Sequence, residues 1–195
     1  LTAVMTGIVL LLALLGPVPA ADAASNQVSA MQDDGRLENA DPGIRNTALD
    51  EMQALGVDVV KLGAFWRRYA PNPNSESKPR VDLTDPASYD WAQLAPAVEG
   101  IIARGLTPWV MISVPGPDWA TKKSTASTQE GIYLPDVKLF AEFVEALGRR
   151  FPEVKILSIG NEPNFQYWLW PQVGKGLVSV SGVHYRKTYV AAQKA

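Results

Sequence analysis

The feature that most constrains this chain is a regular alternation of short apolar runs with longer segments of helical pattern. The apolar runs cover residues 57–65, 106–114 and 154–159, and a shorter run at 27–31 precedes them. Continuous apolar strands need cover on both faces, and strands that alternate with helices form parallel sheets. The pattern therefore predicts an α/β protein with a parallel sheet.

Start and stop residues mark the helices between these strands. Asp41 and Pro42 are typical of a helix N-cap and first position, and Gly56 is a typical C-terminal stop. Similar signals place further helices after Asp90 and after Pro135. The expected helices cover 41–56, 90–105, 135–152 and 184–194.

The first residues have a different character. Residues 7–15 are almost wholly apolar, and Ala21-Asp22-Ala23 fits a small-x-small cleavage site. This layout is typical of a secretory signal peptide, and the apolar run is too short to span a bilayer. We expect residues 1–23 to be a signal peptide, residues 24–195 to be a secreted domain, and no membrane association after cleavage. The alternative is a buried N-terminal helix.

Composition excludes several classes of function. The net charge is −2 with no basic stripe, which argues against nucleic acid or an anionic membrane as a partner. The chain has no cysteine and a single histidine, His184, so neither a thiolate nor a His-based metal site is expected. No cofactor is implied. Six tryptophans are many for this length, and tryptophan either fills cores or stacks on sugar rings.

Four strand–helix units fit either half of an eight-fold barrel or a small open sheet. In both, the loops at the carboxyl ends of the strands carry the chemistry. Here those loops collect polar and aromatic residues, at 33–34, 66–68, 115–119 and 161–170. The acids at 33–34 either bind substrate or end a strand.

The clearest candidate for chemistry is Glu162, which directly follows the last predicted strand and stands between Asn161 and Pro163. Hydrolysis of a glycosidic bond needs one carboxylic acid to protonate the leaving oxygen, and the retaining route needs a second carboxylate about 5 Å away. Asn161 either holds a sugar hydroxyl or satisfies the turn. Four tryptophans near these loops are candidates for sugar stacking or core filling: Trp66, Trp119, Trp168 and Trp170.

The run from Lys155 to Asn164 resembles the fourth-strand signature of clan A glycoside hydrolases, which include family 5 cellulase-like and family 39 enzymes. Residues 57–66 and 106–119 resemble the second and third strands of these enzymes, and 29–34 resembles the first strand of secreted actinobacterial members. The resemblance implies the first four β/α units of a (β/α)8 TIM barrel. It also implies that Glu162 is the acid/base and that Asn161 contacts the sugar 2-hydroxyl.

In that family the nucleophile follows the seventh strand, so we expect it beyond Ala195. Gly160 stands where many members of the clan have Trp. Two further departures point away from family 5 in the narrow sense, but not from the clan: Lys61 replaces an Arg, and a His after the third strand is missing. The expected function is retaining hydrolysis of β-linked oligo- or polysaccharides. The alternatives are an inactive or carbohydrate-binding remnant of such an enzyme, and an unrelated α/β protein.

Overall fold

A computed structural model describes residues 26–123 and 130–195, so the expected signal peptide at 1–23 lies outside the described residues. Its centre is a parallel sheet with the strand order β1-β2-β3-β4. The strands are β1 (Ala30–Gln32), β2 (Val59–Phe65), β3 (Thr107–Ser113) and β4 (Ile156–Ile159). The prediction of a parallel α/β sheet is confirmed, although each strand begins one to three residues later than expected from the apolar runs.

Helices connect successive strands. They are α2 (Asp34–Leu37), α3 (Pro42–Ala54), α4 (Trp66–Tyr69), α5 (Leu94–Ala103), α6 (Val137–Arg150) and α7 (Ser181–Ala192), with short 3-10 turns η1 (Pro86–Ser88), η2 (Asp118–Ala120) and η3 (Lys175–Leu177). The predicted N-cap of α3 is confirmed, because the Asp41 carboxylate accepts a hydrogen bond from the Gly43 N–H at 2.7 Å. Gly56 adopts a φ of +72°, the left-handed conformation that favours glycine after a helix.

Two predicted helix starts are wrong. The helix expected at 184–194 begins three residues earlier, at Ser181. The helix expected from Asp90 begins later. The Asp90 carboxylate accepts a hydrogen bond from the Ala92 N–H within a turn, and α5 begins only at Leu94. Proline is tolerated in the first turn of a helix, where its missing N–H has no partner to lose. A helix beginning after Asp90 would place Pro96 in its interior, whereas the observed start places it in the first turn.

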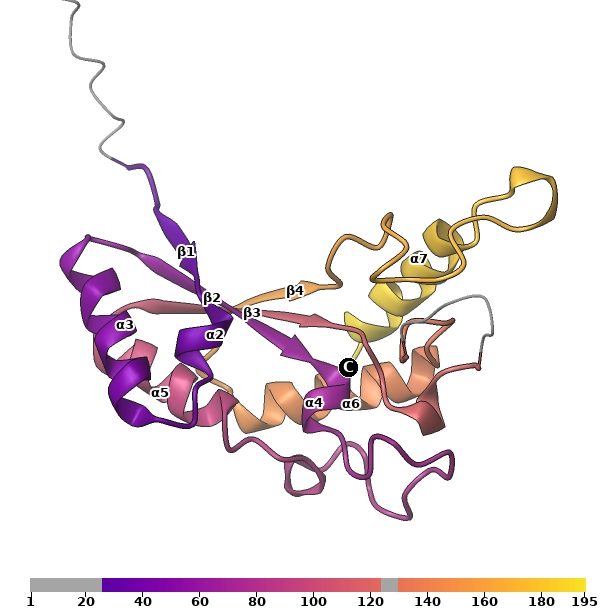
Figure 1. Cartoon of the computed structure of the whole chain (residues 1–195), viewed down its shortest axis with the longest axis horizontal. Coiled ribbons are helices and arrows are strands. Elements are labelled where there is room, and N and C mark those ends of the chain that lie inside the picture. Colours follow the sequence, from indigo (N-terminus) through magenta and orange to yellow (C-terminus); the bar gives the residue numbers. More distant parts are fainter. Residues whose placement is uncertain (1–25, 124–129) are drawn as a thin grey trace, which may run out of the picture.

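The helices are arranged on one side of the sheet. Figure 1 shows α3, α5 and α6 below the strands, and both views show α7 running beside α6. Alternate strand residues facing these helices are fully buried, among them Val60, Leu62 and Ile112. This apolar layer forms the core and fixes the carboxyl ends of the strands along one edge.

The opposite face of the sheet carries more polar side chains. The Lys61 ammonium lies 5.1 Å from the centroid of the Trp109 ring, and the Trp109 indole N–H donates to the Ser158 hydroxyl at 2.9 Å. All three residues are half-buried. Lys61 therefore lies beside an aromatic ring, a position where a cation is attracted to the ring face.

Candidate active site

The two acids that follow β1 have structural roles. Asp33 caps α2 by accepting from the Arg36 N–H at 3.1 Å. Asp34 accepts from the Gly63 N–H at 2.9 Å and from the Gln32 amide at 2.8 Å. Asp33 therefore starts the helix that follows β1, and Asp34 holds the end of β1 against β2, which agrees with the strand-ending alternative for this pair.

Glu162 lies just beyond the carboxyl end of β4, with an exposed side chain and a φ of +37°. The chain leading to it is attached to the end of β3. The Gly160 N–H donates to the Ile112 carbonyl at 2.7 Å, and the Asn161 N–H donates to the Ser113 hydroxyl at 2.9 Å. The backbone that presents Glu162 is therefore positioned by two strands, while its carboxylate is open to solvent.

Gly160 has a steric reason to be glycine. Its φ is +82°, and a Cβ at this position would lie 2.8 Å from the ring of Tyr185 on α7. The Tyr185 hydroxyl donates to the Ile159 carbonyl at 2.8 Å, so the ring is held in this place. At the position where many clan A enzymes have a tryptophan, this chain therefore has a glycine whose neighbouring space is occupied by a helix side chain.

Two of the four tryptophans expected at the site belong to the core. Trp66 has no exposed surface and packs against Phe140 and Phe143, with ring centroids 5.7 and 6.0 Å apart. Trp119 is buried edge-on to Trp66 and donates its indole N–H to the Pro71 carbonyl at 3.0 Å. Neither ring faces the cleft described below, so the expectation that they contact a ligand is corrected to core filling.

The other two tryptophans lie in the loop after β4 and are half-buried. Trp168 stacks on Phe65 at the end of β2. Trp170 is held by its backbone, whose N–H donates to the Ile132 carbonyl at 2.9 Å and whose carbonyl accepts from the Leu134 N–H at 3.0 Å. Of the two, only Trp168 lines a cavity at this edge.

Trp168 separates two hollows. The smaller one is apolar and is lined by Asn161 and Pro163, the two neighbours of Glu162. The larger is an open cleft of about 880 Å³ between the end of β2 and the loops after β3 and β4. Its aromatic lining consists of Phe65, Phe165, Tyr167 and Trp168, and its charged lining of Arg67, Arg68 and Glu130. We call this hollow the rim cleft.

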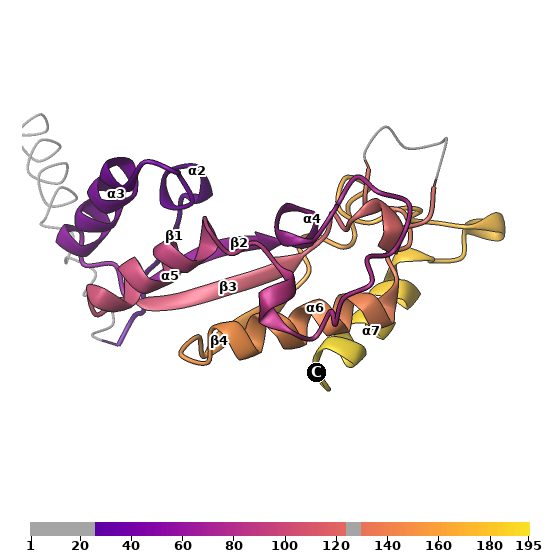
Figure 2. The same ribbon diagram turned by 90° about the horizontal axis from the view of Figure 1, so that it is seen from below.

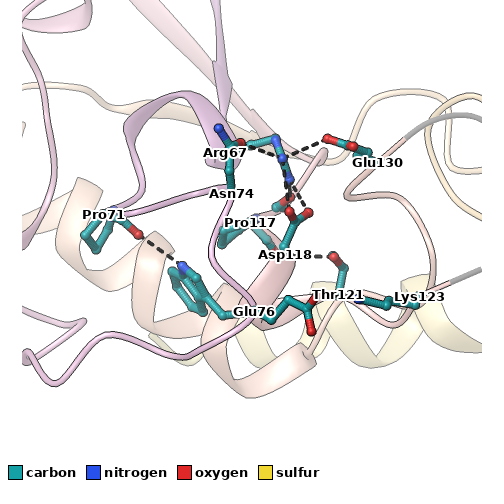
Figure 3. Close-up of polar contacts among 11 residues, drawn as sticks. Arg67, Pro71, Asn74, Glu76, Pro117, Asp118, Thr121, Lys123 and Glu130 are labelled. Atoms are coloured by element: carbon teal, nitrogen blue, oxygen red, sulfur yellow. Dashed lines mark hydrogen bonds and ion pairs between the residues drawn. The ribbon is translucent and has the colours of Figure 1, made fainter.

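Arg67 lines the rim cleft and contacts side chains of two loops, as Figure 3 shows for Asn74, Asp118 and Glu130. Its guanidinium donates to Asp118 at 2.6 Å, to Asn74 at 2.7 Å and to Glu130 at 2.9 Å. A further bond of 3.3 Å reaches the Gly116 carbonyl. Charged hydrogen bonds of this kind fix geometry, so Arg67 holds the loops after β2 and β3 together.

Arg68 is held by a buried acid. The Glu38 side chain is only 1% exposed, and one of its oxygens accepts hydrogen bonds from Arg68 and from the Tyr69 hydroxyl, the latter at 2.7 Å. Its other oxygen is buried without a partner. Burial raises the pKa of the Glu38 carboxyl, while the Tyr69 hydroxyl and Arg68 act in the opposite direction.

Sequence reasoning missed much of this cleft. Phe165 and Tyr167 are the exposed aromatic residues of its wall, and they follow Asn164 almost directly. Their nearness to Glu162 in the sequence was a usable signal. The cluster of Arg67, Asp118 and Glu130 gave no such signal. Asp118 and Glu130 lie 51 and 63 residues from Arg67 in the sequence.

Two searches of the described residues gave negative results. Within 26–123 and 130–195, no group of three or more His, Cys, Asp or Glu side chains could hold a metal ion. In the same part of the chain, no helix is long and apolar enough to cross a membrane.

Comparison with known proteins identifies the type of fold. The sequence matches no protein-family model and no curated protein. Solved structures do match. A β-xylosidase from Caulobacter crescentus CB15 has a TM-score of 0.56 at 14% identity, over 86% of this chain and 33% of its own. A β-glucosidase from Trichoderma harzianum has a TM-score of 0.51 at 16% identity, over 91% and 45%.

A GH39 enzyme from Xanthomonas axonopodis pv. citri gives a TM-score of 0.50 at 16% identity, over 86% of this chain and 31% of its own. The chain thus spans less than half the length of the solved structures it matches. At these identities the likeness shows the fold alone. Between the two folds that the sequence left open, it identifies four β/α units of a TIM barrel, the fold of the matched β-xylosidase and β-glucosidase.

Proposed function

We propose that this chain carries the acid/base half of a retaining glycoside hydrolase that acts on β-linked glycans, with Glu162 as the proton donor. The observation that carries the proposal is the position of Glu162, directly beyond the carboxyl end of β4 in a fold shared with β-xylosidases and β-glucosidases. Chemistry in such barrels is carried by residues at the carboxyl ends of the strands.

In the proposed mechanism Glu162 first protonates the oxygen of the leaving sugar. A nucleophilic carboxylate forms the glycosyl intermediate, and Glu162 then takes a proton from the water that hydrolyses it. Asn161 contacts the 2-hydroxyl of the sugar, and Trp168 and Trp170 are the tryptophans left for contact with the glycan. The nucleophile is expected from a seventh strand. We further propose that the protein is exported after removal of residues 1–23.

A second candidate is a carbohydrate-binding role without turnover. One observation favours it: the described acids around this rim are already engaged, Asp33 and Asp34 with backbone N–H groups and Asp118 and Glu130 with Arg67. None of these carboxylates is an unengaged partner for Glu162.

The test is a comparison of leaving groups in the full-length protein that contains this chain. Glu162→Gln removes the proton donor, so hydrolysis of unactivated oligosaccharides should fall by about a hundredfold or more, and that of dinitrophenyl β-glycosides far less. Glu153→Gln, at the amino end of β4, is the charge-matched control. Unchanged hydrolysis of unactivated substrates by Glu162→Gln would remove Glu162 from this role. Turnover that is absent even before mutation would favour the binding role.

A further inference from the structure

We propose that the hydroxyl groups of Ser113 and Tyr185 position the turn that carries Glu162 for proton donation. Ser113 is the last residue of β3, and Tyr185 lies on α7, so the two hydroxyls reach the turn from different elements. Both act through the backbone of the turn and are therefore positioning residues. Their role rests on the proposed function, because the direction of the turn matters to catalysis only if Glu162 is the acid.

The turn after β4 has an unusual backbone. Gly160 and Glu162 both have positive φ, at +82° and +37°. A residue with a side chain pays about 1 kcal/mol or more in the left-handed region, so Glu162 stays there only where its surroundings hold it. The Glu162 side chain is exposed, and its direction therefore depends on the backbone below it.

Ser113 holds the turn from the side of β3. It is fully buried, and its hydroxyl accepts a hydrogen bond from the Asn161 N–H at 2.9 Å. The backbone pairing of β3 with β4 ends where Ile112 lies opposite Ile159. The Ser113 hydroxyl therefore holds the chain at a residue that is already beyond the paired part of the strand.

Tyr185 holds the same turn from the side of the helix. Its hydroxyl donates to the Ile159 carbonyl at 2.8 Å, and its ring fills the space beside Gly160. Burial raises the pKa of the Tyr185 hydroxyl, so the group remains a donor through the neutral pH range. The contact attaches α7 to the strand end that leads to Glu162.

The two hydroxyls fix the peptide groups on either side of Gly160. The Ile159 carbonyl belongs to the peptide before the glycine, and the Asn161 N–H belongs to the peptide after it. Glycine populates positive and negative φ about equally, so Gly160 is the natural pivot of this segment. With both neighbouring peptides held, the pivot is fixed, and so is the path of the chain into Glu162.

The turn has room to move if this hold is lost. Ser113, Tyr185, Gly160 and Asn161 all line the smaller hollow, so empty space adjoins both hydroxyl-bearing residues and the turn. A proton donor must lie within hydrogen-bond reach of the leaving oxygen, and a displacement of about 1 Å can cost up to about a hundredfold in rate. Loss of either hydroxyl should therefore impair the step that depends on Glu162.

The first experiment compares leaving groups in the full-length protein that contains this chain. Ser113→Ala and Tyr185→Phe each remove a single oxygen atom. We expect kcat/KM for unactivated oligosaccharides to fall by about tenfold in each variant, and for dinitrophenyl β-glycosides by less than about threefold, because dinitrophenolate leaves without a proton. Equal losses on both substrates would overturn the proposal, since a general structural defect does not distinguish leaving groups.

Two matched variants serve as controls. Ser158 lies on β4 and accepts a hydrogen bond from the Trp109 indole, and Tyr189 lies on α7 and accepts one from the Gln193 amide. Neither hydroxyl bonds to the turn. Ser158→Ala and Tyr189→Phe should keep kcat/KM within about twofold on both substrates. Control variants with the same leaving-group pattern as Ser113→Ala would contradict the assignment.

Double variants test whether the two hydroxyls act through Glu162. In the Glu162→Gln protein the group that they position is already gone. Adding Ser113→Ala or Tyr185→Phe should then lower kcat/KM for unactivated substrates by less than about twofold. A further tenfold loss in this background would show that the hydroxyls act by another route, and the proposal would fail.

Hydrogen exchange tests the turn without any need for turnover. Ser113→Ala removes the acceptor of the Asn161 N–H, so this amide should exchange at least about tenfold faster, whereas Ser158→Ala should leave its rate unchanged. An unchanged rate in Ser113→Ala would overturn the positioning role alone, even if Glu162→Gln shows the expected leaving-group pattern. Faster exchange in a protein that hydrolyses nothing would leave the hold on the turn intact and overturn the catalytic role of Glu162.

Discussion

The indole of Trp168 lies flat against the ring of Phe65, with centroids 5.5 Å apart and planes inclined by 13°. Phe65 ends β2, whereas Trp168 belongs to the loop that follows β4, and β3 lies between these two strands. The stack therefore attaches the segment that carries Glu162 to a strand two positions away in the sheet.

Loss of this stack should cost stability as well as ligand affinity. We expect Trp168→Ala to lower the free energy of unfolding by about 2 kcal/mol, less than for a fully buried tryptophan because Trp168 is half-buried. Trp168→Phe keeps a ring on Phe65 and should lose less than about 1 kcal/mol. Urea unfolding followed by circular dichroism measures both. A Trp168→Ala protein as stable as the original would show that the stack does not hold the loop.

The core tryptophan Trp66 should respond differently. Its side chain is fully buried, so Trp66→Ala should cost about 3–5 kcal/mol. Its indole N–H is buried without a hydrogen-bond partner, and Trp66→Phe removes that unpaired donor. The phenylalanine variant should therefore lose less than half as much stability, with its affinity for β-linked oligosaccharides unchanged. A Trp66 variant that lost ligand affinity while keeping its full stability would show that Trp66 contacts the ligand.

Glu38 predicts a pH dependence of stability. Its pKa is raised in the folded protein by burial, so between about pH 4.5 and that raised pKa the folded state binds more protons than the unfolded state. The stability that Glu38 contributes is complete below about pH 4.5 and is lost as pH rises through the folded pKa.

Glu38→Gln removes this titration, so its unfolding free energy should decline less than that of the original chain between pH 4.5 and pH 8. Chemical denaturation at a series of pH values gives both curves. Parallel curves for the two proteins would show that Glu38 titrates alike in the folded and unfolded states.

The outer strands of the sheet predict self-association. Among the described residues β1 and β4 each pair with one neighbour, and Ile156 and Leu157 of β4 are 39% and 42% exposed. Unpaired strand edges with apolar side chains bind other chains. We expect residues 24–195 to form oligomers or aggregates in light scattering and to show no turnover.

A charge on this edge should oppose the association. Leu157→Lys should increase the monomer fraction in the same measurement, and Leu55→Lys, at a 71% exposed leucine after α3, is the control. A monomeric and active fragment on an aryl β-glycoside would refute this expectation.

Local signals predicted much of the fold. Asp41, Pro135 and Gly56 mark helix ends through local signals, and the structure has helix ends within two residues of each. The helix start predicted from Asp90 was wrong because Pro96, further along the chain, restricts where α5 can begin. The parallel sheet followed from the alternation of strands and helices, which requires no knowledge of distant contacts.

The site was less predictable, because its geometry depends on long-range contacts. A tryptophan beside a strand end has the same sequence pattern whether it turns inward, as Trp66 does, or lines a cleft, as Trp168 does. The partners of Arg67 come from the loops after β2 and β3, and no spacing rule connects them. Glu162 was an exception, because it was selected from its position after a predicted strand and from the residues next to it in the sequence.

The contact between Gly160 and Tyr185 has an evolutionary consequence. A side chain at position 160 and an aromatic ring at position 185 compete for the same volume, so position 160 cannot gain a side chain while the tyrosine stays. A lineage that acquires a tryptophan at 160 must first or simultaneously lose the tyrosine from α7. Relatives with a side chain at position 160 should therefore lack the tyrosine at 185, whereas relatives that keep Gly160 can carry either, and this one-way dependence would trace the divergence of the strand end that presents Glu162.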